Sequence, residues 1–278
     1  MKNFMKQLIR SFQYSLYPDD SMKVDWVKQK NFGDILNPVL IELLTGKKPN
    51  HIVSKYFNDG VYYSVIGSIL GRAKKNTIVW GSGYISSEDK VIDKPKKICA
   101  VRGPKTRERL IEQGYECPEV YGDPALLMPL LYKPVITKKY KLGIIPHYVD
   151  KSNNWLNDID SDGVKVLDIH TNQPLDFINQ MLECERIASS SLHGLIISDA
   201  YEIPSVWIEF SDKVTGHGFK FVDYFLSVGQ EKLDSIKIQE GLTCQMLIDA
   251  CEYKGVNLDL KKLIKSAPFE VSLNINEL

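Results

Sequence analysis

Three serines and a histidine stand where an apolar strand gives way to an apolar helix, in the run Ser189-Ser190-Ser191-Leu192-His193-Gly194. The start of a helix leaves backbone N–H groups unpaired and carries about half a positive charge, so it attracts phosphate or carboxylate. His193 falls in the first turn, and histidine is the side chain best suited to exchange protons near neutral pH. The segment therefore predicts an anion site with His193 as its acid-base group; the alternative is a histidine that only caps its helix.

The elements that must present this segment alternate between strands and helices along the chain. Short β-rich runs end in Gly67, in Gly81-Ser82-Gly83, in Arg102-Gly103 and in Gly122-Asp123. In a parallel sheet such strand ends meet at one edge, where ligands bind. We therefore expect glycine, arginine and aspartate to gather at that edge.

The alternation weakens once, between Pro129 and Tyr140, before a new apolar strand begins at Leu142. This interruption predicts a first domain over residues 1–135 and a second over 136–278, which ends in a charged helical tail. Near the start of the chain we expect a helix with Pro38 close to its first position and Gly46 past its end. The fold class is therefore α/β, with two Rossmann-like domains and ligands in the cleft between them.

Composition and charge exclude several classes of function. Lys plus Arg and Asp plus Glu both total 35, so the net charge is zero and nothing marks the chain for nucleic acid. The 278 residues are 44% apolar, enough for two domains with a core each. The 5 cysteines form no Cys-x-x-Cys pair, which argues against a disulfide framework or a zinc site and favours a reducing cytoplasm. Because the P-loop, dinucleotide and His-Glu-x-x-His motifs are missing, we expect no nucleotide cofactor and no metal.

Residues 1–17 form an amphipathic pattern, with Lys2, Lys6 and Arg10 on one helical face and apolar side chains on another. Such a helix either docks on its own protein or lies in the surface of an anionic membrane. No run of the chain reaches the roughly 18 to 20 apolar residues of a spanning helix, and the segment lacks the core of a signal peptide. We predict a cytoplasmic protein whose peripheral contact with the inner face of the membrane, if it makes one, runs through this segment.

Seven motifs, taken in order, resemble those of the polysaccharide pyruvyl transferase family and cover most of the chain. They are Asn31-Phe32-Gly33-Asp34, the glycines Gly67 and Gly81-Ser82-Gly83, Val101-Arg102-Gly103, Gly122-Asp123-Pro124-Ala125, Ile145-Pro146-His147-Tyr148, Ser190-Ser191-Leu192-His193-Gly194 and Phe219-Lys220-Phe221-Val222-Asp223-Tyr224. They look like the branch that acts on bacterial exopolysaccharide and capsule intermediates. The resemblance implies two Rossmann-like domains arranged as in the GT-B glycosyltransferases.

The resemblance also implies phosphoenolpyruvate as the donor, with no other cofactor, and a cyclic pyruvate ketal on a sugar as the product. Such a reaction needs one group that protonates the methylene carbon, and cationic or N–H groups that hold the carboxylate and phosphate. His193 is then the acid-base group. Ser190, Ser191 and Leu192 at the helix start hold the anionic end of the donor, and Arg102 pairs with its carboxylate or phosphate.

One position departs from the family pattern. Many relatives carry an arginine two residues before the histidine, where this chain has Ser191. Another cation must take its place, and Arg102, Lys220 and Arg72 are the candidates in that order. For each of them a solvated surface charge is the alternative.

The acceptor is expected on the first domain, as a lipid-linked or nucleotide-linked sugar of a polysaccharide precursor. Asn31 and Asp34 offer an amide and a carboxylate for sugar hydroxyls, or could cap a helix instead. Asp123 precedes a proline and is either a turn residue or an acceptor contact. His217, flanked by two glycines, is a further candidate contact to the acceptor.

Two other functions stay open from the residues. A GT-B glycosyltransferase using a nucleotide sugar would share the architecture but needs a site for nucleobase and ribose. A sugar-binding module without turnover would need no histidine at a helix start. Pyruvyl transfer requires only a compact anion pocket.

Overall fold

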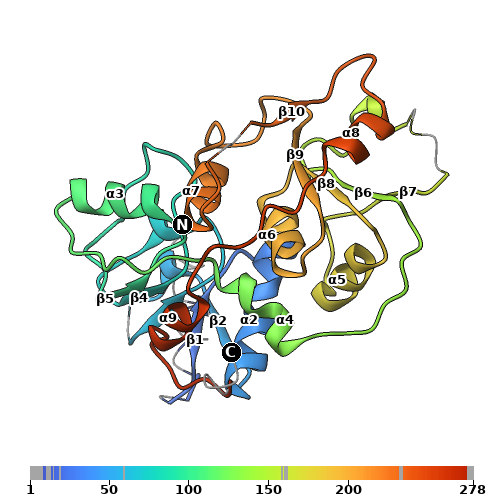
Figure 1. Ribbon diagram of the computed structural model, residues 1–278. Coiled ribbons are helices and arrows are strands. Elements are labelled where there is room, and N and C mark those ends of the chain that lie inside the picture. Colours follow the sequence, from blue (N-terminus) through green and yellow to red (C-terminus); the bar gives the residue numbers. More distant parts are fainter. Residues whose placement is uncertain are drawn as a thin grey trace.

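Two parallel sheets of five strands form the framework of the computed structural model, which describes residues 9–10, 14, 16–18, 20–58, 60–157, 159, 162–231 and 234–273 (Figure 1). The first sheet has the order β2-β1-β3-β4-β5 and contains β1 (Lys23–Asp25), β2 (Asn50–Ile52), β3 (Tyr62–Ser64), β4 (Thr77–Trp80) and β5 (Lys97–Ala100). The second has the order β10-β9-β8-β6-β7 and contains β6 (Leu142–Ile145), β7 (Val164–Val166), β8 (Ile187–Ser189), β9 (Ser205–Glu209) and β10 (Ile236–Lys237). Every pairing within the two sheets is parallel.

Counted along the chain, both sheets have the same strand order, 2-1-3-4-5. This confirms an α/β fold with two domains, and it specifies the doubly wound order of flavodoxin rather than the 3-2-1-4-5-6 order of dinucleotide-binding domains. In such sheets the ligand crevice lies where the strand order reverses. That point falls between β1 and β3 in the first sheet and between β6 and β8 in the second.

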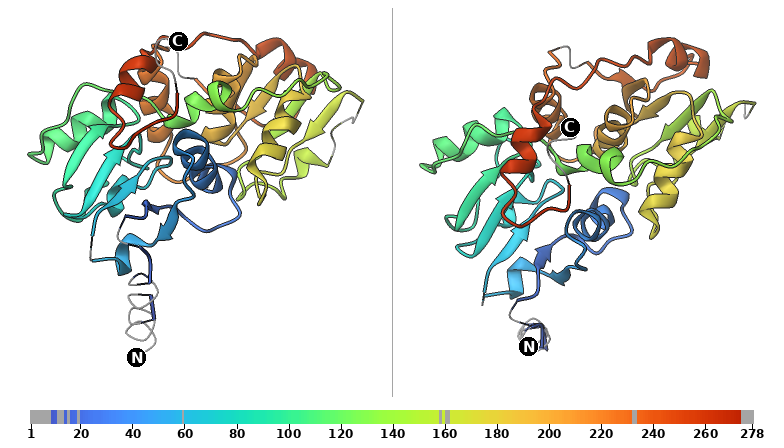
Figure 2. Two further views of the ribbon diagram at one scale, coloured as in Figure 1. Left: turned by 90° about the horizontal axis from the view of Figure 1, so that it is seen from below. Right: turned by 60° about the horizontal axis from the view of Figure 1, so that its bottom comes forward.

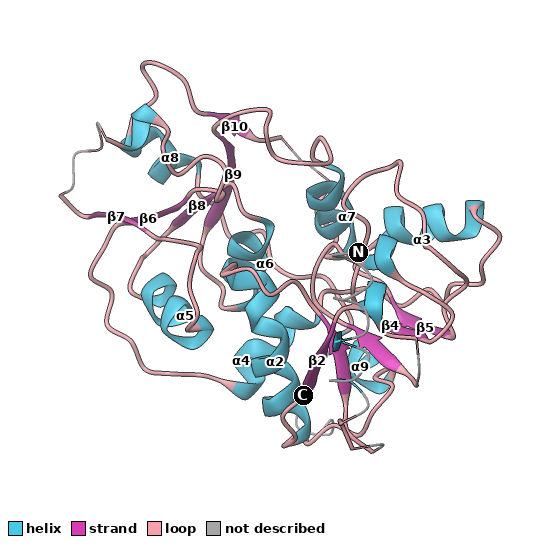
Figure 3. Cartoon of the chain, turned by 180° about the vertical axis from the view of Figure 1, so that it is seen from behind, coloured by secondary structure: helices cyan, strands magenta, loops and turns pink. Residues whose placement is uncertain are grey.

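Helices connect and cover the strands, as Figure 3 shows from behind. The α-helices are α2 (Phe32–Thr45), α3 (Pro104–Glu112), α4 (Met128–Leu131), α5 (Pro174–Leu182), α6 (Leu192–Ala200), α7 (Phe219–Ser227), α8 (Cys244–Ala250) and α9 (Leu260–Lys265). Short 3-10 turns are η1 (Ser54–Tyr56), η2 (Leu70–Arg72), η3 (Pro124–Leu127) and η4 (Asn154–Leu156). Helices α2 and α6 lie between the two sheets (Figures 1 and 2).

Helix α2 begins at Phe32, not near Pro38 as the sequence predicts. Asn31 is its N-cap, and Pro38 stands inside the helix, where it cannot donate to the carbonyl of Asp34. The side chain of Asn37 replaces the missing donor, because its amide nitrogen lies 3.1 Å from the Asp34 carbonyl oxygen. A proline is therefore tolerated in the interior of this helix.

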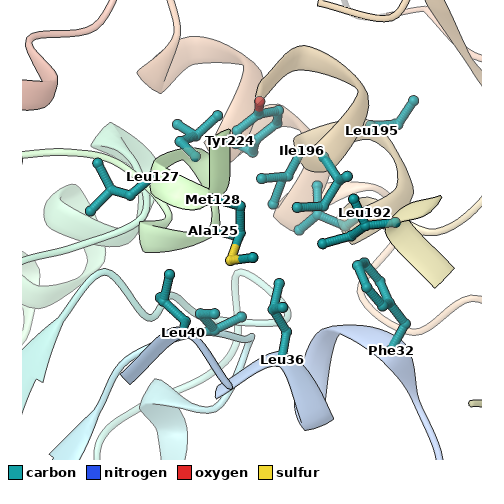
Figure 4. Close-up of a cluster of buried hydrophobic side chains, with 14 of the residues drawn as sticks. Phe32, Leu36, Leu40, Ala125, Leu127, Met128, Leu192, Leu195, Ile196 and Tyr224 are labelled. Carbon is teal, nitrogen blue, oxygen red and sulfur yellow. The ribbon is translucent and has the colours of Figure 1, made fainter. Parts of the chain in front are cut away.

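One continuous hydrophobic core joins the two halves, where the sequence predicts a core for each. Figure 4 shows Leu36 and Leu40 of α2 facing Met128 of α4. Leu192 and Ile196 of α6 point into the same cluster. Among the described residues, two smaller clusters lie beside the first sheet and one beside the second. The cleft-facing ends of α2 and α6 are thus held by shared packing.

Segments late in the sequence return to the first sheet. Helix α7 packs on α3, and the indole N–H of Trp80 donates to the carbonyl of Leu263 in α9 at 3.1 Å. The strands of the two sheets fall on either side of residue 135, while these later helices contact the first half. The division into residues 1–135 and 136–278 stays a prediction.

Most of the amphipathic segment 1–17 lies outside the described residues. Of its described side chains, Tyr14 accepts a hydrogen bond from the backbone N–H of Val53 at 2.9 Å. Tyr17 donates to the carbonyl of His51 at 3.1 Å. Across the part of the chain that the structure describes, we find no helix with the length and apolar character needed to span a bilayer.

Candidate active site

A cavity of about 190 Å³ lies where the crevices of the two sheets meet. The loops after β1 and β3 line it from one side, and the loops after β6 and β8 line it from the other. Its described lining residues are Val27, Gln29, Asn31, Asp34, Gly67, Ser68, Ile69, Ile85, His147, Tyr148, Ser191, Leu192, His193 and Lys220. The cavity therefore occupies the position where doubly wound sheets bind ligands.

The start of α6 presents unpaired donors to this cavity. Ser191 is the N-cap in extended conformation, and its side chain makes no capping bond. The Ser189 hydroxyl instead fixes the turn, since it accepts from the Ser191 N–H at 3.1 Å and donates to the Ser191 carbonyl at 2.9 Å. Gly194 allows this approach, because a Cβ there would lie 2.3 Å from the Ser189 oxygen. The first N–H groups of the helix are left without an intrahelical partner.

His193 is held between the two halves of the molecule. Its side chain is 14% exposed, and its Nε2 lies 3.6 Å from Oδ2 of Asp123. The ring packs so closely on α2 that a Cβ at Gly33 would lie 2.0 Å from Nδ1. The glycine of the Asn-Phe-Gly-Asp motif is therefore required by the histidine that faces it.

Asn31 and Asp34 line the opposite side of the cavity at the start of α2. The Asn31 side chain accepts from the Gly33 N–H at 3.2 Å, so it caps the helix as well as lining the site. Burial raises the pKa of Asp34 to about 6, against the attraction of His193, Arg72 and Lys220, which lowers it. A carboxyl that titrates near neutrality can act as a general base.

The turn opposite Asp34 is fixed by a buried asparagine. Asn37 is fully buried, accepts from the Ile66 N–H at 2.9 Å and donates to the Ile66 carbonyl at 3.2 Å. These bonds tie α2 to the start of the loop after β3. They place Gly67, which has φ of +115°, beside Asp34.

Lys220 is the single lysine or arginine among the described lining residues. It is 8% exposed, and no hydrogen bond to its ammonium group occurs within the described chain. Burial and the nearby charge of Arg102 lower the pKa of Lys220 to about 8, while Asp34 opposes this shift. Its Nζ lies over the Phe221 ring, 5.4 Å from the ring centroid. A desolvated ammonium group without a hydrogen-bond partner is suited to receive an anion.

Arg102 lies outside the lining of the cavity and is fully buried. Its Nε donates to Oδ2 of Asp223 at 2.9 Å, Nη1 to the Ser68 hydroxyl at 2.7 Å and Nη2 to the Tyr84 carbonyl at 2.6 Å. Thr106 also donates to Asp223, through its N–H at 2.8 Å and its hydroxyl at 2.7 Å. The guanidinium thus ties α7 of the second half to the first half.

Glycines permit this buried pair. A Cβ at Gly83 would lie 2.6 Å from the guanidinium carbon of Arg102, and one at Gly103 would lie 1.8 Å from the Asp223 carbonyl oxygen. The glycine-marked strand ends therefore serve close packing around an ion pair. No phosphate contact is needed to explain these two positions.

Comparisons with known proteins agree with this arrangement. The family model for polysaccharide pyruvyl transferase matches residues 31–212. This chain belongs to that family. It is a pyruvyltransferase enzyme, and the match contains every cavity-lining residue except Val27, Gln29 and Lys220.

Proteins similar to this pyruvyltransferase occur in a virus and in bacteria. It is 31% identical to the uncharacterized protein L143 of Acanthamoeba polyphaga mimivirus in an alignment of 222 residues that covers 74% of each chain. It is 28% identical to the succinoglycan biosynthesis protein ExoV of Rhizobium meliloti over 210 residues, covering 73% of this chain and 64% of ExoV. A crystal structure of a functionally uncharacterized protein from Klebsiella pneumoniae matches with 12% identity and a TM-score of 0.46, over 86% of this chain and 98% of that one.

The pyruvyltransferase brings six of the ten residues expected at its site into the cavity: Asn31, Asp34, Ser191, Leu192, His193 and Lys220. Ser190 lies behind it, where its hydroxyl accepts from the His147 N–H at 2.7 Å. His217 is exposed and lines a separate pocket of about 50 Å³. Arg102 and Asp123 are buried beside the cavity rather than in its lining.

Two residues that line the cavity, His147 and Ser68, are not among the ten expected from the sequence. His147 lines the cavity, and burial together with Lys220 and His170 lowers its pKa to about 4, so it is neutral and can donate or accept a hydrogen bond. The position of His147 just after an apolar strand is the sequence feature that could have predicted its place in the site. Ser68 also lines the cavity while it holds Arg102, and no local pattern marks that role. Among the described residues, no three histidine, cysteine or carboxylate side chains are placed to hold a metal ion.

Proposed function

We propose that this enzyme transfers pyruvate from phosphoenolpyruvate to two hydroxyls of a sugar in an exopolysaccharide precursor, forming a cyclic ketal and releasing phosphate. The observation that carries the proposal is the cavity itself. It combines a histidine, a desolvated lysine and an uncapped helix start on one side with a carboxyl and an amide on the other. Family membership supports the class of reaction, and the geometry supports the assignment of roles.

The donor is placed on the α6 side of the cavity. Lys220 pairs with its phosphate or carboxylate in place of the arginine that Ser191 replaces. The Ser191 hydroxyl and the N–H groups at the start of α6 supply further hydrogen bonds. Arg102 supports this site through the Ser68 hydroxyl rather than by direct contact.

The proton transfers divide between the two sides of the cavity. His193 gives a proton to the methylene carbon, and the oxygen of a sugar hydroxyl adds to the adjacent carbon while Asp34 takes its proton. The bond from that carbon to the phosphate oxygen breaks, and the second hydroxyl adds to close the ring. One hydroxyl proton balances the proton given to carbon, and the other leaves with the phosphate.

The size of the cavity supports a small donor. Pockets for drug-sized ligands hold about 300 to 1,000 Å³, whereas this one holds about 190 Å³. A nucleotide sugar bound as the donor would have to place its nucleobase and ribose inside this cavity, whereas phosphoenolpyruvate would not, and an acceptor needs to place only its sugar there. We further propose that the two sheets form a GT-B-like pair, with the sugar entering between them as a lipid-linked or nucleotide-linked precursor on the cytoplasmic side.

Binding of the donor can be measured without knowing the acceptor. Calorimetric titration with phosphoenolpyruvate should give a dissociation constant that weakens at least tenfold in Lys220→Met and stays unchanged in Lys213→Met, which alters an exposed lysine of a nearby loop. UDP-glucose serves as the comparison ligand. Failure of phosphoenolpyruvate to bind, whether alone or in the presence of UDP-glucose, would overturn the proposal.

Turnover is the second test. Wild-type enzyme incubated with phosphoenolpyruvate and a lipid-linked oligosaccharide fraction should release inorganic phosphate in step with a ketal methyl signal in the proton NMR spectrum. His193→Gln should abolish both. Phosphate release without the methyl signal would mean hydrolysis of the donor and would contradict the proposed transfer.

A further inference from the structure

Two buried polar atoms face one another beside the cavity, and neither has a hydrogen-bond partner. They are Nε2 of His193 and Oδ2 of Asp123, 3.6 Å apart. Asp123 is 1% exposed. Buried polar atoms are nearly always paired, so two unpaired atoms at this distance call for an explanation.

The position of Asp123 is fixed from its other side. Its Oδ1 caps η3 by accepting from the Ala125 N–H at 3.0 Å. A Cβ at Gly81 would lie 2.1 Å from the ring of Pro124, so the following residue is also wedged in place. The carboxylate is therefore a rigid group with one oxygen committed to the fold and one turned to the histidine.

We propose that Asp123 is a positioning residue for His193, resting on the proposed function. Asp123 accepts a hydrogen bond from the Nε2–H of His193, which fixes the ring orientation and the tautomer. Nδ1 is then the ring nitrogen that takes up a proton to form the imidazolium and gives that proton to the methylene carbon of the donor, which returns the ring to the Nε2–H tautomer. Catalytic hydrogen bonds commonly tighten as the substrate complex forms, and protonation of the ring would draw Nε2 toward the carboxylate from the observed 3.6 Å.

The other charged groups around His193 cannot fill this role. Asp34, Lys220 and His147 all line the cavity, so they face the substrate volume. Asp123 does not line it, and its contact with the ring comes from behind. A carboxylate behind an acid-base imidazole holds the tautomer and stabilises the imidazolium that forms during turnover.

The tautomer gives a readout that does not depend on activity. Nitrogen-15 NMR of histidine-labelled protein, with the His193 signals assigned by their loss in His193→Gln, should show the Nε2–H tautomer in the wild type at neutral pH. In Asp123→Asn the amide group can donate to Nε2, so the signals should change to those of the Nδ1–H tautomer. The asparagine still offers an oxygen to the Ala125 N–H, which preserves the cap.

Two further variants make the test specific. Asp123→Ser keeps a capping oxygen but leaves nothing opposite Nε2, so it should give a mixture of tautomers. Asp199→Asn neutralises another buried aspartate, near the far end of α6, and should leave the wild-type tautomer. An Nε2–H tautomer that persists in Asp123→Asn and Asp123→Ser would overturn the proposal.

Kinetics separate this proposal from the proposed function. If the enzyme transfers pyruvate, Asp123→Asn should lower kcat by about 10²-fold to 10⁴-fold while KM for phosphoenolpyruvate changes less than threefold. Suppose that the wild type is inactive with phosphoenolpyruvate but that His193 shows the expected tautomers in the wild type and the variants. That result would overturn the proposed function and support Asp123 as the positioning residue of His193. Wild-type rates of pyruvyl transfer in Asp123→Asn would overturn the positioning role of Asp123 and support the proposed function.

Discussion

Replacing Lys220 by methionine should stabilise the unliganded enzyme and weaken its hold on the donor. The ammonium group is almost completely buried and has no hydrogen-bond partner among the described residues, so its charge is poorly compensated. Methionine has a similar length and fills the same space without a charge. A residue that destabilises the empty protein and binds an anion is typical of a functional site.

The size of the effect follows from the pKa of Lys220, which burial lowers from 10.5 to about 8. That difference corresponds to roughly 3 kcal/mol. Below pH 8 both folded and unfolded chains carry the proton, so the full penalty applies at pH 7. Between pH 8 and 10.5 the folded chain releases the proton first, so the stability of the wild type should rise with pH through this window.

Part of the gain in Lys220→Met is offset by Asp34. The ammonium charge lowers the pKa of Asp34, so its removal leaves that partly buried carboxylate with less compensation. We therefore expect a net stabilisation between about 1 and 3 kcal/mol at pH 7. The affinity for phosphoenolpyruvate should fall at least tenfold, because the buried partner of its anionic group is gone.

Urea unfolding of the wild type, Lys220→Met and Lys213→Met at steps from pH 7 to pH 10.5 measures the stabilities. The control variant should follow the wild type throughout. The free energy of unfolding of Lys220→Met should exceed that of the wild type at pH 7, and the difference should shrink as the pH rises. The assigned burial penalty of Lys220 would be refuted if Lys220→Met were less stable than the wild type at pH 7. It would also be refuted if the difference in free energy of unfolding stayed constant from pH 7 to pH 10.5.

Three other variants test neighbouring parts of the site. Gly33→Ala gains about 1 kcal/mol in helix propensity but places a Cβ 2.0 Å from the His193 ring, so steady-state kinetics should show kcat lowered at least tenfold. Because the pKa of Asp34 is raised from 3.8 to about 6, its contribution to stability falls as the pH rises through that interval, so urea unfolding should show Asp34→Asn gaining stability relative to the wild type between these pH values. Arg102→Met leaves the buried Asp223 carboxylate without its cationic partner and should lower the free energy of unfolding by about 3 to 5 kcal/mol. Adding Asp223→Asn should restore part of that loss, which a double-mutant cycle measures.

The sequence could predict the elements of this fold better than their order. Apolar runs and glycine-marked ends identify most strands, because burial and turns act locally. The start of α2 could not be predicted, because a side chain of Asn37 replaces the N–H that Pro38 lacks. Strands β2 and β10 are too short and polar to stand out, yet each extends the edge of its sheet.

The same contrast holds for the site. Asn31, His193 and Lys220 could be singled out because polar side chains after strand ends converge in any parallel sheet. Arg102 satisfied that rule as well, yet its guanidinium is occupied by Asp223, which lies 121 positions further along the chain. A pairing of that length leaves no local pattern, so the sequence alone could not distinguish a donor contact from a structural tie.

Helices α2 and α6 occupy equivalent places in the two sheets, but their N-termini offer opposite chemistry. The first turn of α2 contains Asp34 and is capped by the side chain of Asn31, so its positive end is already compensated. The first turn of α6 has no acidic residue, and the side chain of Ser191 does not cap it. An anion is therefore favoured at α6 and a neutral, hydroxyl-rich ligand at α2. Lys220 lines the same cavity as this helix start, so we expect its charge to serve in place of an arginine at position 191.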